Sequence, residues 1–140
     1  MTKVRALDHI AIATTDLEAS LRLFAEALGI HCDHVEDLPE RGIRVAMLPI
    51  GDTRIELVMP LHDKSEISAF LDKRGPGIHH IALRTDDVDG DIAELKAKGV
   101  KIAQEPAAGA HGCRVAFLHP KATGGVLLEL STVPDNDRPR

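Results

Sequence analysis

The chain has 140 residues and a formal net charge of −5, and 44% of its residues are hydrophobic but only 2% are aromatic. This length suits one compact domain or two small modules that share a core. The sequence has no Tyr, no Trp and no basic stripe, which excludes chemistry that needs a tyrosine acid and argues against nucleic acid as a partner.

The chain begins with a pattern that predicts a strand followed by a helix. Residues 4–13 alternate loosely and are rich in Val, Ile and Ala, which is typical of a half-buried strand. Thr15 and Glu18 form a Thr-x-x-Glu capping box. Apolar residues at helical spacing over 17–28 then predict an amphipathic helix, with Gly29 as its C-terminal cap.

A hairpin and a connector follow this helix. Residues 30–36 predict a short edge strand, and residues 42–58 predict a β-hairpin that turns at Gly51-Asp52. The stretch 61–76 is a connector in which Ser65 is the candidate cap of a short helix.

The second half of the chain repeats this order of elements. Residues 78–84 read as a strand, Asp86 or Asp87 caps a helix, and Gly99 closes that helix as Gly29 closes the first. Residues 112–131 then predict a second hairpin. Both cysteines lie in or beside apolar runs without zinc-type spacing, so we expect buried thiols outside any disulfide.

The two hairpins are copies of each other, which indicates that the chain contains two copies of one module. Five residues recur 70 positions later: Gly42, Arg44, Val45, Ala46 and Leu48 match Gly112, Arg114, Val115, Ala116 and Leu118. We therefore predict an α+β fold with a first βαβββ module at 4–60, a helical connector at 61–76, a second βαβββ module at 77–133 and a flexible tail at 134–140. Two such sheets related by a pseudo-twofold axis would form an open metal-binding barrel with a shared cleft.

Each module carries one His and one Glu at matching positions. His9 and His80 lie in the first strands, and Glu56 and Glu129 lie in the last strands. Alternation sends their aliphatic neighbours to the opposite face. Neutral imidazole plus carboxylate suits a divalent metal ion, so the four residues together predict a metal site. Taken singly, each His would more often be structural, and each Glu would pair with an Arg because a buried carboxylate is costly without a cation or donor.

The remaining histidines give weaker indications. His79 points to the face opposite to His80, and we expect it to be structural. His111 and His119 lie near the predicted cleft and are candidate substrate contacts, whereas the others are expected to be solvated. No apolar run is long enough for a membrane span and the first residues lack a signal-peptide core, which predicts a cytoplasmic protein without a membrane partner.

Three motifs carry a resemblance to a known family. DHIAIAT at 8–14, GIHHIAL at 77–83 and FLHPKATGGVLLEL at 117–130 resemble the vicinal oxygen chelate superfamily, and within it the methylmalonyl-CoA epimerase family. The likeness runs from about residue 5 to residue 132. The His-Glu-His-Glu pattern is specific to the superfamily only. The loop 119–125 favours the epimerases because related lyases carry an Asp-Pro-Asp-Gly-type turn there.

The resemblance implies a site and its cofactor. His9, His80 and Glu129 match the recurring metal ligands of the superfamily, and Glu56 stands where some members have Gln and others Glu. The implied ion is divalent: cobalt, with manganese, nickel or zinc as alternatives. An acyl-CoA substrate and a homodimer are implied as well. Val45 departs from the pattern, since some members carry at this position a Glu proposed as catalytic base.

The activity implied is epimerisation at C2 of methylmalonyl-CoA, by proton abstraction through a metal-stabilised enolate. Glu56 and Glu129 are the candidate proton-transfer groups, with water or Glu40 as the competing second base. Lys121 is a candidate contact for the phosphates or the substrate carboxylate, against the alternative of a solvated loop lysine. Glyoxalase I (lactoylglutathione lyase) and a non-catalytic small-molecule-binding member of the superfamily are the alternative functions. An extradiol dioxygenase would need a Tyr that the chain lacks.

Overall fold

The computed structural model describes residues 4–133, so the predicted tail at 134–140 lies outside the described residues. The first half contains β1 (Val4–Ala13), α1 (Leu17–Leu21), the π-helical continuation η1 (Arg22–Ala27), β2 (His34–Leu38), β3 (Ile43–Ile50), β4 (Thr53–Pro60) and α2 (Glu66–Arg74). The second half contains β5 (Gly77–Thr85), α3 (Val88–Ala97), β6 (Ile102–Ala108), the 3₁₀ turn η2 (Ala110–Gly112), β7 (Arg114–Leu118), α4 (Pro120–Thr123) and β8 (Leu128–Thr132).

This order confirms the predicted α+β class built from two βαβββ modules. The described residues pack as two compact units: an N-terminal unit, His9–His79, and a C-terminal unit in which residues 4–8 join residues 80–133. The unit boundaries therefore fall inside β1 and inside β5. The finer module limits stay a prediction from the sequence.

The two halves have the same strand order and the same directions. The strands run β2-β3-β4-β1 in the first half and β5-β8-β7-β6 in the second. β1 is parallel to β4 and β5 is parallel to β8, whereas the pairs β2–β3, β3–β4, β6–β7 and β7–β8 are antiparallel. The register repeats as well, because Ala11 pairs with Glu56 and Ala82 pairs with Glu129.

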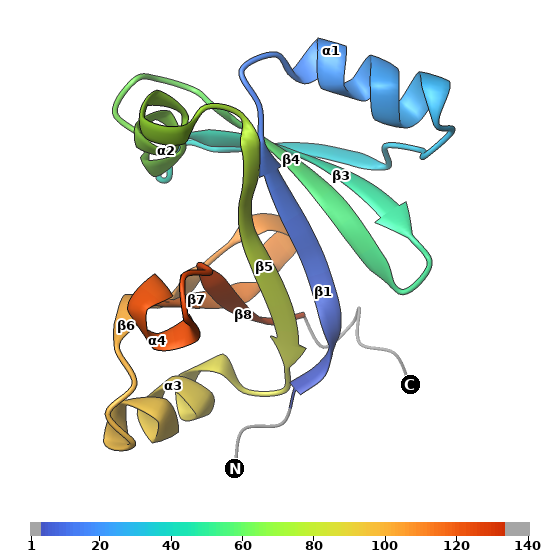
Figure 1. Cartoon of the computed structure of the whole chain (residues 1–140). Helices are drawn as coiled ribbons and strands as arrows, with labels where there is room; N and C mark the ends of the chain where they lie inside the picture. The colour runs from blue at the N-terminus through green and yellow to red at the C-terminus, as the bar shows by residue number, and fades with distance from the viewer. Residues whose placement is uncertain (1–3, 134–140) are drawn as a thin grey trace. The chain divides into compact units, whose positions relative to one another are not determined.

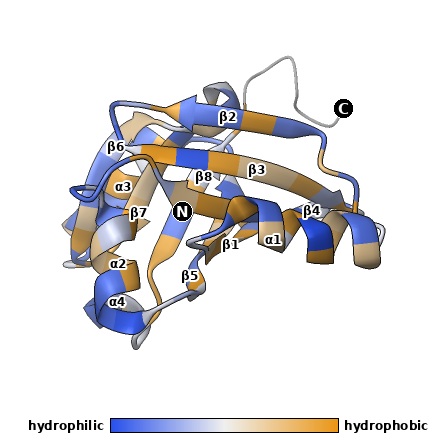
Figure 2. Ribbon diagram, turned by 90° about the horizontal axis from the view of Figure 1, so that it is seen from above, coloured by the Kyte–Doolittle hydropathy of each residue, from blue (hydrophilic) through white to orange (hydrophobic). Residues whose placement is uncertain are grey.

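An apolar cluster lies between the helix and the sheet of each unit. In the N-terminal unit it contains Leu17, Ala46, Leu48 and Leu57, so α1 lies beside β3 and β4 (Figure 1). In the C-terminal unit it contains Val88, Ile92, Ala116, Leu118 and Leu130. β3 is hydrophobic along most of its length, whereas the edge strand β2 is mainly hydrophilic (Figure 2). Burial of one sheet face in each unit leaves the other face for polar side chains.

The helix starts of the two modules are also copies. Asp16 accepts a hydrogen bond from Ala19 N at 3.0 Å, and Asp87 accepts one from Gly90 N at 3.0 Å. The predicted capping box of Thr15 and Glu18 is therefore wrong, because the side chain that reaches the first-turn N–H belongs to Asp16. The prediction of Asp87 as one of the two candidate caps is confirmed, as is that of Ser65 as the cap of α2.

The first helix departs from regular α-helical geometry. Leu28 N donates to Leu23 O at 2.9 Å, a spacing of five residues that defines the π-helix η1. Leu28, expected on the apolar face of the helix, is instead its C-cap and is 59% exposed. The following strand β2 also starts later than the predicted edge strand at 30–36, because Ile30 and Cys32 pack against the apolar cluster of the N-terminal unit.

The two hairpins differ in their connections. Gly51 and Asp52 join β3 to β4 as predicted, and Gly51 has a φ of +57° that favours glycine. In the second hairpin the connection folds into α4, whose N-cap is His119. Cys32 is half-buried and Cys113 is buried, and neither forms a disulfide. Among residues 4–133, no helix has both the length and the apolar character needed to cross a membrane.

Candidate metal centre

One His–Glu pair lies on β1 and β4 in the N-terminal unit. His9 Nδ1 lies 3.0 Å from Glu56 Oε2, and the two residues are only 4% and 5% exposed. The sequence places them together because His9 and Ala11 share a face of β1, and Ala11 is the register partner of Glu56. The neighbours Ile55 and Leu57 face the apolar cluster on the other side of β4. The alternation expected from the sequence therefore produces a buried imidazole–carboxylate contact.

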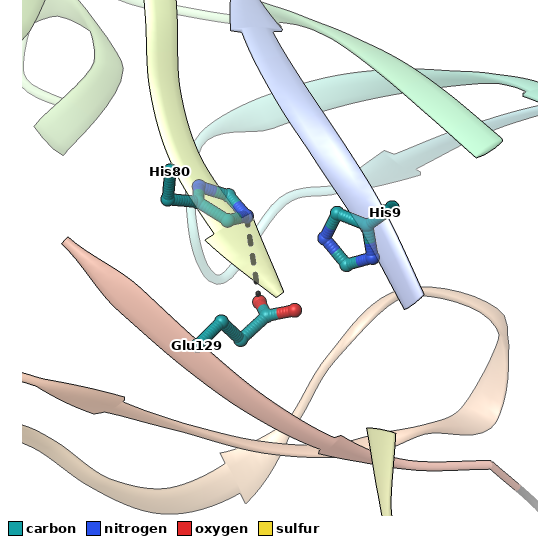
Figure 3. A group of neighbouring side chains, drawn as sticks. All are labelled: His9, His80 and Glu129. Atoms are coloured by element: carbon teal, nitrogen blue, oxygen red, sulfur yellow. Dashed lines mark ion pairs between the residues drawn. The ribbon is translucent and has the colours of Figure 1, made fainter. Parts of the chain in front are cut away.

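The matching pair lies on β5 and β8 in the C-terminal unit. His80 Nε2 lies 3.6 Å from Glu129 Oε1, and the side chains point toward each other from the two strands (Figure 3). His80 is 8% exposed and Glu129 is 4% exposed. The ring of Phe117 stands edge-on to the His80 ring, with centroids 5.2 Å apart. The same sequence pattern and register thus give the same kind of pair in both units.

The donor chemistry of these residues fits a divalent metal ion. Among the described residues, the buried donors that could hold an ion include His9, Glu56, His80 and Glu129. Imidazole nitrogen and carboxylate oxygen are ligands that Zn²⁺, Co²⁺ and Mn²⁺ all accept, so the donor set does not select one metal. Two carboxylates would offset the charge of a divalent ion. The residues present therefore suit the cofactor class that the sequence predicts.

Three charged residues on these strands were missed in the sequence: Arg54, Arg84 and Asp8. Arg54 Nε donates to Glu56 Oε2 at 2.9 Å, and Arg84 Nε donates to Asp8 Oδ1 at 3.0 Å. Asp8 is fully buried and is also one of the buried donors that could hold a metal. A signal for Arg54 was present, since it stands two residues before Glu56 and so shares its strand face. No comparable signal identified Asp8.

Lys121 differs from the two His–Glu pairs because it is exposed and lies on a short helix. It is exposed on the short helix α4, and its backbone N–H donates to His119 Nδ1 at 3.1 Å. Burial, followed by the charges of Lys101 and Lys121, lowers the pKa of His119. A neutral ring suits this cap because its Nδ1 must accept the hydrogen bond. His119 therefore has a structural function as the N-cap of α4.

The other histidines differ in surroundings. The ring of His79 meets Phe70 edge-on at 5.0 Å, and burial lowers the pKa of His79, so it lies in a packed environment. His111 is exposed and has a φ of +56°. His34, expected to be solvated, has its Nε2 2.9 Å from Glu36 Oε1.

The two pairs differ from Glu40, which was weighed as a second base, and from Val45, which stands where some superfamily members carry a Glu. Val45 is 2% exposed on β3 and has no group that titrates. Glu40 is exposed in the turn between β2 and β3. Both carboxylates of the His–Glu pairs, by contrast, are buried on strands.

Comparison with known proteins places these features in a family. Residues 8–117 match the model of the Glyoxalase/Bleomycin resistance protein/Dioxygenase superfamily. The mitochondrial methylmalonyl-CoA epimerase of Mus musculus is 39% identical over 130 residues, which are 91% of this chain and 73% of that protein. An ethylmalonyl-CoA/methylmalonyl-CoA epimerase of Cereibacter sphaeroides is 40% identical over 130 residues, which are 91% of this chain and 97% of that protein.

Solved structures agree with the sequence comparison. A variant of Streptomyces coelicolor methylmalonyl-CoA epimerase, in complex with 2-nitronate-propionyl-CoA, matches with a TM-score of 0.93 and 38% identity, covering 98% of this chain and 100% of that chain. A probable chloroplastic lactoylglutathione lyase of Arabidopsis thaliana is more distant, at 28% identity over 37% of its length. The resemblance found in the sequence motifs is confirmed. The chain belongs to the glyoxalase/bleomycin resistance protein/dioxygenase superfamily, and within it is similar to the methylmalonyl-CoA epimerases.

Proposed function

We propose that the chain is a metal-dependent epimerase that interconverts the (R)- and (S)-forms of methylmalonyl-CoA at C2. The observation that carries this proposal is the duplicated buried His–Glu pair, at 3.0 Å in one unit and 3.6 Å in the other. Similarity to proteins named methylmalonyl-CoA epimerase over about nine-tenths of the chain supports the substrate class.

We infer that His9, Glu56, His80 and Glu129 hold one divalent ion. Their burial and their donor chemistry support this assignment. Such an ion supplies Lewis-acid stabilisation of the negative charge that develops on a thioester oxygen. Cobalt as the ion, the homodimer and the cytoplasmic location stay predictions from the sequence.

Proton transfer at C2 is the task of the chain's own carboxylates. The C2 hydrogen of a methylmalonyl thioester lies between two carbonyl groups, which makes it acidic enough for a carboxylate to remove. Inversion needs a base on each face of C2 or one mobile base. We assign Glu56 to one face and Glu129 to the other, with water or Glu40 as the competing second base. Val45 has no group that could hold this proton.

Lys121 is proposed to bind the anionic part of the substrate. Its side chain is exposed and cationic on α4, as a contact to a phosphate or carboxylate requires. Lys121→Ala should raise KM more than it lowers kcat, whereas Lys73→Ala, at an exposed lysine on α2, should leave both unchanged. Unchanged kinetics in the Lys121 variant would identify it as a solvated lysine.

Proton NMR of methylmalonyl-CoA in deuterated water tests the function directly. The metal-loaded protein should replace the C2 hydrogen by deuterium and interconvert the two stereoisomers. Absence of both changes would overturn the proposal. Conversion of methylglyoxal and glutathione by the same sample would instead identify the lyase activity, and ligand binding without turnover of either substrate would identify a binding protein.

A further inference from the structure

Arg54 makes a direct contact with one carboxylate of the candidate metal centre. Its Nε lies 2.9 Å from Glu56 Oε2, and this oxygen is also the one that lies 3.0 Å from His9 Nδ1. The Arg54 side chain is 19% exposed and that of Glu56 is 6% exposed, so this is not a solvated surface ion pair. Two nitrogens from two strands thus converge on one oxygen of Glu56.

The C-terminal unit lacks this cation at the matching position. Arg54 precedes Glu56 by two residues, and Leu127 precedes Glu129 by two residues. A leucine side chain has no donor to offer a carboxylate. The two modules therefore share the imidazole and the carboxylate, and they differ in the residue that stands next to the carboxylate on the same strand.

We propose that Arg54 is a positioning residue that holds the Glu56 carboxylate in the orientation it needs as a metal ligand. A guanidinium donating to a carboxylate makes a short, charge-assisted hydrogen bond that fixes direction as well as distance. Groups that orient a ligand in this way typically contribute about 10- to 100-fold to metal affinity. The inference rests on the metal site of the proposed function and assigns Arg54 a function in ligand geometry.

The test is Co²⁺ affinity, measured by titrating chelator-treated, full-length protein against a competing chelator. Arg54→Leu places in the first module the residue type of Leu127, and we expect Co²⁺ binding to weaken about 10- to 100-fold. Arg54→Lys keeps the charge and a donor nitrogen, so most of the affinity should return. Arg44→Leu is the control, because Arg44 makes a more exposed ion pair with Asp37 on the neighbouring strands.

The possible outcomes distinguish failure of the proposed role of Arg54 from failure of the metal site or of the proposed function. Equal Co²⁺ affinity of the wild type and Arg54→Leu would overturn the positioning role, and so would an equal loss in Arg44→Leu. If the wild type binds no Co²⁺, both the metal site and the role of Arg54 fail. If the wild type binds Co²⁺ and shows the Arg54 effect without epimerase activity, the proposed function fails and the role of Arg54 stands.

Thermal unfolding of the metal-free variants separates positioning from folding. A positioning role predicts that Arg54→Leu and Arg54→Lys unfold at similar temperatures but differ in Co²⁺ affinity. If Arg54→Leu does not fold, Arg54→Gln replaces it, because Gln keeps a donor without the charge. Equal Co²⁺ affinity of Arg54→Gln and the wild type would show that the charge of Arg54 has no function in holding Glu56.

Discussion

The two modules repeat their backbone and their donors more faithfully than the surroundings of those donors. Ala11 pairs with Glu56 and Ala82 pairs with Glu129, so register and pair are the same in both. The hairpin connections differ, since Gly51-Asp52 is a tight turn and Pro120–Thr123 is a helix. Strand register and the His–Glu pair are therefore common to both modules, whereas the hairpin connection is particular to each module.

The difference between the hairpin connections also bears on the proposed substrate contact. The tight turn of the first module has no lysine, whereas α4 of the second module exposes Lys121. The proposed substrate contact therefore belongs to one module only. The proposed metal donors, in contrast, come in equal number from both.

The largest expected effect tests whether both modules are needed for the ion. His9→Ala and His80→Ala each remove one imidazole ligand, and each should weaken metal binding by more than about 100-fold, beyond the effect of an orienting residue. Metal content and epimerase activity should fall together. His79→Ala, at the neighbouring position of β5, should retain the ion. Full metal occupancy in either ligand variant would show that the modules do not act as a pair.

The next effect tests whether the two carboxylates transfer protons at opposite faces of C2 of the substrate. Glu56→Gln and Glu129→Gln keep an oxygen ligand but remove the base. Each variant should bind metal, and each should exchange C2 deuterium into only one stereoisomer of methylmalonyl-CoA, the opposite one in each case. Wild-type epimerisation by Glu56→Gln would show that Glu56 holds the ion without moving the proton.

A smaller effect compares the ends of the two module helices. Gly29 has a φ of +74° and Gly99 a φ of +82°, and a Cβ would meet no atom within 4 Å at either position. Replacement by Ala should therefore cost about 1 kcal/mol of unfolding free energy at each site through backbone strain alone. Chemical denaturation measures this, with Gly77→Ala as the control because its φ is not positive. A large cost at only one site would show that the helix ends are not equivalent.

The smallest effect concerns the pH dependence of stability through His79. Burial, aided by the charge of Arg41 and opposed by that of Glu66, lowers the pKa of His79 below its ordinary value of 6.5. As the pH falls through this value, the unfolded chain takes up the proton first, so the folded state loses stability. Metal-free His79→Leu should lose less unfolding free energy than the wild type between about pH 7.5 and about pH 5.5. An equal loss would assign the pH dependence to other groups.

The sequence predicted the parts of the structure that follow from local pattern and repetition. Alternation placed His9 and Glu56 on one face of the sheet, and Gly51-Asp52 marked the turn. The repeat could also have identified the helix cap, because Asp16 lies 71 positions before Asp87, whereas a capping-box motif favoured Thr15. Two local motifs can predict different caps for one helix, and here the residue at the matching position of the second module predicts the observed cap.

Other features could not be predicted because they depend on packing. The π-helix over Arg22–Ala27 arises from a hydrogen-bond shift that no residue type demands. Asp8 meets Arg84 76 residues away, so only the folded strands bring the two together. Arg54 lies between these cases: its strand face was predictable, but its contact with Glu56 rather than with solvent required the structure.

The number of ions bound per chain tests the central claim that both His–Glu pairs serve one metal site. Calorimetric titration of the chelator-treated protein with Co²⁺ should give one ion per chain, with that single binding event lost in both His9→Ala and His80→Ala. Two ions per chain, each lost in only one of these variants, would contradict the account and show that each module binds its own ion.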